Sequence, residues 1–199
     1  DQARPNDPVG RGQDDYSLGI KYLRGIGVQK DVAKAVQYLQ KASGEGSAES
    51  QLALGYLYME GNGVTKDVQH GLDLFRKAGV QGNADAQYNV GLAYVRGEMV
   101  AQDYAEALKW FEMAAEQGDA GAQYNLGVMQ LHGEGTVQDP VMASIWFALA
   151  SDQAYPGAGE GMATAKTMMK SDQLQRLNGE ILKVRERIQR MKPQSASID

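Results

Sequence analysis

The chain has 199 residues, of which 43% are hydrophobic and 23% charged, and a formal net charge of -5. This acidic balance argues against general nucleic-acid binding, which needs a basic face, and no apolar run approaches the roughly 20 residues that cross a bilayer, so no direct membrane insertion is expected. The absence of cysteine excludes disulfides and cysteine-based zinc sites.

Residues 1–12 carry two prolines, Pro5 and Pro8, and no apolar period. We predict a flexible N-terminal leader there, with the first helix beginning at Gln13. The sequence does not start with methionine, and we therefore expect that a preceding stretch was removed, either by a signal peptidase or by the choice of where this sequence begins.

Four glycines recur with one fixed period, because Gly19, Gly55, Gly91 and Gly127 each lie 36 residues after the one before. Such self-similarity is the signature of a repeat protein. We predict four repeats, at about residues 13–47, 48–83, 84–119 and 120–155. Glycine at this position is expected to let two helices of a repeat approach closely.

The third copy, residues 84–119, predicts a helical hairpin. Small and apolar residues from Ala86 to Tyr94 share one face of a first helix, helix A, which Gly97 ends. Asp103 stands at the N-cap of a second helix, helix B, and Glu106 three residues later predicts a capping box.

Aromatic residues recur on one face of helix B, and we expect all of them in the core: Phe75, Phe111, Phe147, Trp110 and Trp146. A hairpin this short cannot bury its own apolar face. Successive hairpins must therefore stack, and we predict one continuous solenoid rather than two globules.

After the fourth copy the pattern weakens. Met162 and Ala163 lie 36 residues beyond Leu126 and Gly127, which predicts half of a fifth repeat from residue 156. We assign residues 156–192 to this half repeat and a following helix, and residues 193–199 to a loose tail.

The last helix is predicted to begin at Ser171 or Asp172. Its apolar residues, three and four apart, are Leu174, Leu177, Ile181, Val184, Ile188 and Met191. This stripe favours a cap over the exposed end of the solenoid, which leaves the protein a monomer. The alternative is a dimerising helix, because the same spacing makes a coiled-coil seam.

The repeat resembles that of the Sel-one-like repeat (SLR) family, a relative of the tetratricopeptide repeat. The loop sequences GIGV (25–28), GNGV (61–64) and GEGT (133–136) carry the resemblance, together with the spacing A-x-x-x-L-G-x-x-Y before them. Met99 replaces the second glycine in GEMV, so that turn is expected to differ. The resemblance implies an all-α fold: a right-handed superhelical α/α solenoid of four 36-residue hairpins, a degenerate half repeat and a C-terminal capping helix.

Residues for catalysis are not recognisable. His70 and His132 each lack a second ligand at metal-binding spacing. The Gly-x-Gly loops follow helices rather than strands and recur with the repeat, which indicates turns rather than phosphate sites. We predict no catalytic residues, no metal, no cofactor and no enzymatic activity.

In stacked helical hairpins the A helices line the concave surface, so we expect partner contacts from the A-helix residues that point away from helix B. Helical spacing selects a set of polar, charged and apolar residues on this face. Its members are Arg24, Tyr56, Glu60, Asn89, Leu92, Arg96, Asn125, Val128 and His132. By resemblance to tetratricopeptide repeats, Asn89 and Asn125 could hold a peptide backbone; the alternative is that asparagine is common at this position whatever the ligand.

The resemblance implies a non-enzymatic module that holds a partner protein, in bacteria often in the envelope, and we expect an exported, periplasmic protein, with a cytoplasmic one as the alternative. Two roles stay open, a scaffold and an immunity protein that neutralises a secreted toxic effector such as a lipase or phospholipase. A remote alternative is a hydrolase of β-lactam-like substrates, as suggested for cysteine-rich relatives, but this chain lacks their cysteines.

Overall fold

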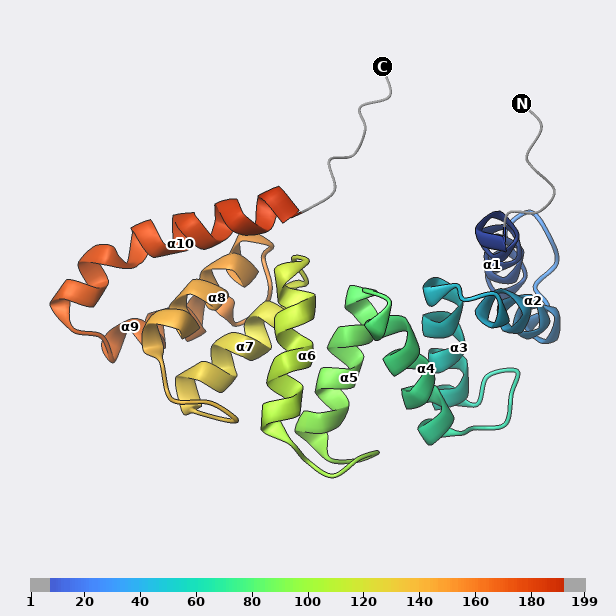
Figure 1. The fold of residues 1–199 in the computed structure, drawn as a ribbon, viewed down its shortest axis with the longest axis horizontal. Coiled ribbons are helices and arrows are strands. Elements are labelled where there is room, and N and C mark those ends of the chain that lie inside the picture. Colours follow the sequence, from blue (N-terminus) through green and yellow to red (C-terminus); the bar gives the residue numbers. More distant parts are fainter. Residues whose placement is uncertain (1–7, 192–199) are drawn as a thin grey trace, which may run out of the picture. The chain divides into compact units, whose positions relative to one another are not determined.

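The structure is a computed structural model that describes residues 8–191, with side chains from residue 14 onward, and these residues form ten helices and no strand (Figure 1). The helices are α1 (Pro8–Arg24), α2 (Val32–Gly44), α3 (Ala48–Glu60), α4 (Val68–Val80), α5 (Ala84–Arg96), α6 (Tyr104–Glu116), α7 (Ala120–His132), α8 (Pro140–Asp152), α9 (Ala158–Thr167) and α10 (Ser171–Met191). The odd-numbered helices α1 to α7 are the A helices and α2 to α8 the B helices. The all-α fold of four helical hairpins is confirmed.

The first helix begins earlier than its sequence indicates. Helix α1 starts at Pro8, so residues 8–12, expected in the leader, are helical. Proline suits the first turn of a helix because that turn does not need its missing amide hydrogen. The remainder of the predicted leader, residues 1–7, and the predicted tail, residues 193–199, lie outside the described part of the chain.

The chain divides into two compact units, Asp1–Val90 and Gly91–Asp199, and the boundary falls within α5. In a repeat protein each hairpin contacts only its neighbours. Few contacts therefore cross any boundary drawn between two successive hairpins. The first unit contains the α1–α2 and α3–α4 hairpins, and the second contains α6 to α10.

Each B helix begins at a capping aspartate, as the sequence predicts. The Asp103 side chain accepts a hydrogen bond of 3.0 Å from the backbone N–H of Glu106. The predicted capping box is wrong in its second half: the Glu106 carboxylate bonds Lys109, which raises the pKa of that ammonium, and the Asp103 N–H donates to the carbonyl oxygen of Tyr94. The N-cap amide therefore already has a partner in helix A.

The predicted close approach of helices at the repeated glycines is confirmed. A Cβ atom on Gly91 would lie 2.6 Å from Cε1 of Phe111, and one on Gly127 would lie 2.7 Å from Cδ1 of Phe147. Both rings are almost completely buried. Glycine therefore leaves the space that each ring fills.

One aromatic expectation is wrong. Phe75, Phe111, Phe147 and Trp146 are buried, but Trp110 is only half-buried. An indole is so large that neighbouring helices rarely cover all of it.

A column of buried glutamines, which the sequence analysis missed, links neighbouring repeats. Gln87 donates from Nε2 to the carbonyl oxygen of Gly79 at 2.8 Å, and Gln123 donates to that of Ala115 at 3.1 Å. In the repeat before, Gln51 accepts from Gln81 at 2.7 Å. Gln87 and Gln123 thus satisfy backbone carbonyls at the ends of the preceding B helices, which lack helical partners, whereas the bond of Gln51 to Gln81 lies within the second repeat.

The turn that contains Met99 differs from its counterparts, as expected. Gly27, Gly63 and Gly135 have φ angles of 72°, 74° and 70°, whereas Ala154 alone among described residues other than glycine has a positive φ. Met99 therefore does not adopt the left-handed conformation that its counterparts share.

Helix α9 continues the 36-residue period, because its buried Ala158 and Ala165 lie 36 residues after the buried Ala122 and Met129 of α7. Helix α9 begins at Ala158, and its buried residues are Ala158 and Ala165, whereas Ala163 is exposed. Met162, 36 residues after Leu126, packs against the core cluster around Phe147, so only the position of Gly127 differs in α9. Gly161 instead approaches the Phe147 ring.

Helix α10 is a cap on the second unit (Figure 1). Leu177, Ile181 and Ile188 are buried, and the helix contacts α8. Arg185 adds an ion pair of 2.7 Å to Asp152 of α8. The apolar stripe is thus used within the chain, although Leu174 and Met191 at its ends stay exposed.

Candidate functional site

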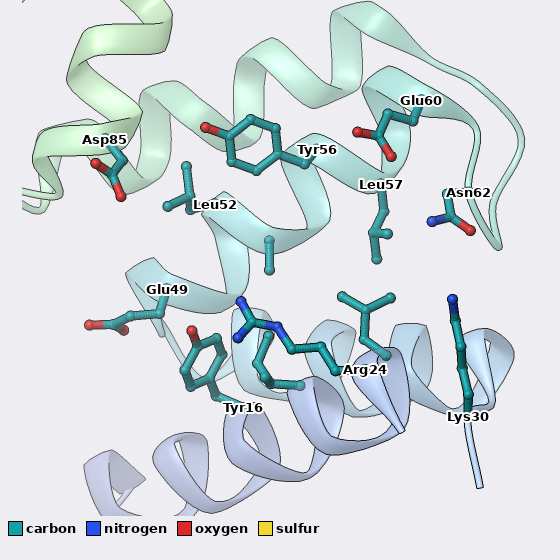
Figure 2. Close-up of a pocket in the computed structure, with 13 residues that line it drawn as sticks. Tyr16, Arg24, Lys30, Glu49, Leu52, Tyr56, Leu57, Glu60, Asn62 and Asp85 are labelled. Atoms are coloured by element: carbon teal, nitrogen blue, oxygen red, sulfur yellow. The ribbon is translucent and has the colours of Figure 1, made fainter. Parts of the chain in front are cut away.

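The first unit contains a cleft of about 460 Å³, which we call the α1/α3 cleft (Figure 2). Its residues come from α1, from α3, from the loops that follow these helices and from the first turn of α5. They are Tyr16, Ile20, Leu23, Arg24, Lys30, Glu49, Leu52, Ala53, Tyr56, Leu57, Glu60, Asn62 and Asp85. The volume lies within the usual range of binding pockets.

The floor of the cleft is apolar. Ile20 and Leu23 of α1 and Ala53 of α3 are partly buried and pack against the core of the first unit. Leu57, which is 3% exposed, belongs to that core. A fixed core thus supports an accessible apolar surface.

Tyr56 stands beside this floor and is held by two contacts. Its ring makes an edge contact with Phe75, with centroids 5.0 Å apart and planes at 67°. Its hydroxyl accepts a hydrogen bond of 2.7 Å from Nδ2 of Asn89. The side chain nevertheless stays 42% exposed, so a preoriented aromatic ring is available to a partner.

The two asparagines proposed as backbone clamps differ in their contacts. Asn89 donates from Nδ2 to Tyr56 and to the carbonyl oxygen of Asp85, both at 2.7 Å, so its amide hydrogens are used within the chain. Asn125 donates from Nδ2 to the carbonyl oxygen of Gly121 at 2.8 Å. Because an amide group has only two hydrogens, Asn89 offers a partner its Oδ1 acceptor but no free donor.

Charged residues of both signs surround the cleft. Glu49 and Asp85 stand at one end, in the first turns of α3 and α5, and Lys30 stands at the other end (Figure 2). Arg24 and Glu60 lie in the last turns of α1 and α3. All five are exposed.

The structure brings some of the predicted partner-binding residues together. Arg24, Tyr56 and Glu60 line the α1/α3 cleft, and Asn89 joins them through Tyr56. The remaining members belong to the second unit: Leu92, Arg96, Asn125, Val128 and His132. Of these, Arg96 and His132 are exposed, Leu92 and Asn125 are half-buried, and Val128 packs against the core cluster around Phe147.

Sequence reasoning missed part of the lining. Tyr16, Leu23, Lys30, Leu52 and Asn62 contribute to the cleft, but we selected A-helix residues only by their spacing from the repeated leucine. A signal was present for Tyr16, because the same repeat position holds Leu52, Tyr88 and Tyr124. Lys30 and Asn62 lie in loops, where helical spacing does not apply.

Neither histidine lies in a metal site of the described residues, among which no cluster of three or more His, Asp or Glu side chains is suited to a metal ion. His70 packs edge-on against Tyr58, with ring centroids 4.4 Å apart. In the same part of the chain, no helix has the length and apolar character of a membrane span.

Two solved structures are similar to this chain. The chain is similar to a protective antigen of uropathogenic Escherichia coli strains that displays an SLR fold, with 31% identity and a TM-score of 0.75 over 94% of this chain and 42% of that one. It is also similar to a Sel1 repeat protein from Oxalobacter formigenes, with 28% identity and a TM-score of 0.74 over 90% of this chain and 73% of that one. The chain thus spans less than half the length of the first protein. No curated protein sequence matches it.

The repeat identifies the family to which the chain belongs. The Sel1 repeat matches residues 15–47, 48–83, 84–119 and 120–155, so it covers all four hairpins. The solved structures that resemble the chain have the same repeat. The chain therefore belongs to the Sel1 repeat family, whose members are generally protein–protein interaction modules.

Proposed function

We propose that this protein acts by binding, without catalysis, and that it holds a segment of a partner protein in the α1/α3 cleft. The family supports a protein as the partner. The position of Tyr56 supports this cleft as the site. The residues predicted to contact a partner lie in both units. The proposal restricts the binding site to those of the first unit.

The single observation that carries the proposal is the exposed but immobilised ring of Tyr56 beside an apolar floor. Tyrosine is enriched among residues that dominate binding energy, because a rigid ring buries a large area at a small entropic cost. The contacts with Phe75 and Asn89 fix the ring before a partner arrives. Pre-organisation of this kind lowers the entropic penalty of association.

We further propose that the protein works outside the cytoplasm. The likeness to a protective antigen favours this location, since an immune response must reach such a protein. Fractionation of the source cells with an antibody against this chain tests the location. Recovery only from the cytosol would contradict it.

Affinity capture with two matched variants tests the binding site. Wild type, Tyr56→Ala and Val137→Ala are immobilised in parallel and exposed to envelope extract of the source cells. Val137 is the control, because it is 84% exposed and lies outside the cleft. We expect wild type and Val137→Ala to retain the same partner and Tyr56→Ala to lose most of it. Equal retention by all three proteins would contradict the proposed site.

A further inference from the structure

One position of the A helices differs between the repeats in a way that changes the α1/α3 cleft. Successive repeats hold Ser17, Ala53, Asn89 and Asn125 at this position. Each asparagine donates from Nδ2 to the backbone carbonyl oxygen four residues earlier, at 2.7 Å in α5 and 2.8 Å in α7. The repeat therefore accepts asparagine at this position with its helix intact, and alanine in α3 is the exception.

Ala53 and Ile20 are the apolar counterpart of the pair that Asn89 forms with Tyr56. Ile20 lies 36 residues before Tyr56, as Ala53 lies 36 residues before Asn89. The later pair joins α5 to α3 by a hydrogen bond of 2.7 Å. The earlier pair consists of hydrocarbon side chains, which pack against the core of the first unit and line the cleft. The floor is therefore apolar at the point where the next repeat has an amide.

This floor favours an apolar ligand group over a polar one. Its side chains contain only carbon and hydrogen: Ile20, Leu23, Ala53 and Leu57. A polar side chain that enters the cleft loses hydrogen bonds to water and gains none from these groups, whereas an apolar side chain gains by leaving water. Figure 2 shows Tyr16 of α1 on one side of the floor and Tyr56 of α3 on the other, so two rings flank the space.

From these contacts we infer that Ala53 determines which side chain the cleft admits, and that the partner segment inserts an apolar side chain, leucine or phenylalanine, over Ala53 and Ile20. The inference rests on the proposed function of the cleft and specifies its ligand. An asparagine at position 53 would bond to the carbonyl oxygen of Glu49, as its counterparts bond four residues back. Its amide would then cover the hydrocarbon floor and remove the preference.

Uncharged synthetic peptides test the inference. The probes are acetylated peptide amides of the sequence Gly-Ser-X-Ser-Gly, in which X is leucine, phenylalanine, alanine or asparagine. Binding to the full isotope-labelled chain is followed by the shifts of its backbone amide signals in NMR titrations. These shifts also report whether the peptide contacts the residues that line the cleft.

For wild type, we expect the leucine and phenylalanine peptides to bind about fivefold to tenfold more tightly than the alanine peptide, as for a side chain that leaves water by about half. The asparagine peptide should bind no better than the alanine peptide. The largest shifts should fall on α1 and α3.

Two protein variants carry the same new residue at the same repeat position. Ala53→Asn places the amide in the cleft, and Ser17→Asn is the matched control, because Ser17 is exposed and lies outside the cleft. Circular dichroism confirms that both are folded. Ala53→Asn should reduce the preference for leucine over alanine to less than about twofold, whereas Ser17→Asn should keep it. A change that only destabilised the fold would not alter this ratio of affinities.

Three results would overturn the inference. They are equal binding of the leucine and asparagine peptides to wild type, no shifts at the cleft with any peptide in the millimolar range, and an unchanged preference for leucine in Ala53→Asn.

The capture experiment separates such a failure from a failure of the proposed function. If Tyr56→Ala loses the partner but Ala53→Asn retains it as well as Ser17→Asn does, the cleft binds the partner without the selectivity assigned to Ala53. If Tyr56→Ala retains the partner as wild type does, the proposed binding site itself is wrong.

Discussion

Asn89 of α5 donates a hydrogen bond of 2.7 Å from Nδ2 to the hydroxyl oxygen of Tyr56 in α3. The bond joins helices A of two successive repeats and fixes the aromatic ring beside the α1/α3 cleft. Asn89 thus positions the Tyr56 ring. A direct clamp on a peptide backbone would instead need free amide hydrogens on Asn89.

Asn89→Ala tests this positioning role. We expect Asn89→Ala to lower the free energy of unfolding by about 0.5–1.5 kcal/mol more than Asn125→Ala does, for the one hydrogen bond to Tyr56 that only Asn89 makes, and to weaken partner binding because Tyr56 gains freedom. Asn125→Ala is the matched control, since Asn125 has the same repeat position but bonds only its own helix, at Gly121. Chemical unfolding and partner binding are measured for both. Equal effects of the two changes on binding would argue against a special role of Asn89.

Gly91→Ala tests the close approach of helices in the third hairpin. The new Cβ atom would lie 2.6 Å from Cε1 of the buried Phe111 ring, so overpacking should destabilise the protein by about 1–3 kcal/mol. Gly179→Ala in α10 is the control, because its Cβ atom would meet no other heavy atom within 4 Å. Alanine there should stabilise the helix by up to about 1 kcal/mol. Equal melting temperatures for the two variants would refute the packing described for Gly91.

Phe111 and Trp110 are neighbours in α6 with different burial, and truncation should separate them. Phe111→Ala should cost about 3–5 kcal/mol through cavity formation, because the ring is 0% exposed. Trp110→Ala should cost clearly less, since the indole is half-buried and truncation leaves a smaller cavity. Urea unfolding of the two variants provides the comparison. A larger loss for Trp110→Ala would mean that the structure has assigned the core residue of this helix wrongly.

Glu112 of α6 gives a prediction for the pH dependence of stability. Glu112 is exposed, but partial desolvation raises the pKa of its carboxyl group above the ordinary value of 4.5, and the Glu116 carboxylate raises it further. A raised pKa in the folded state means that the ionised group opposes folding above that pKa, and that this penalty vanishes below the unfolded value. Glu112→Gln should therefore raise the melting temperature at pH ~7, and the gain should disappear near pH ~3.5.

Glu180→Gln is the control for this effect. Glu180 forms an ion pair of 2.8 Å with Lys183, so its removal should not stabilise the protein at neutral pH. A gain for Glu112→Gln that persists unchanged in acid would show that the carboxylate charge is not its cause.

The repeated part of the fold could be predicted from the sequence because local rules determine it. The aspartate at the start of each B helix and the glycine opposite Phe111 follow from capping and from close packing, and both recur with the period. The half repeat was harder, since Ala163, 36 residues after Gly127, is exposed, and Gly161 approaches the Phe147 ring in its place.

The candidate site was predictable only in part. Helical spacing found Tyr56 and Arg24, because both lie on the exposed face of an A helix. It could not find Lys30, which reaches the cleft from a loop, nor the partner of Asn89. Such contacts join residues that are distant in sequence, as Asn89 and Tyr56 are, and a helical period contains no information about them.

The most direct test of the central claim is site-specific photo-crosslinking of the partner in envelope extract. A benzophenone amino acid replaces Glu60 at the edge of the α1/α3 cleft or, in separate preparations, Val137 or Leu182, which are exposed and lie outside it. The account predicts a crosslinked product of one partner for the Glu60 position and none for the other two. Crosslinking from Leu182 on α10 or from Val137, with none from the Glu60 position, would contradict the assignment of the cleft as the binding site.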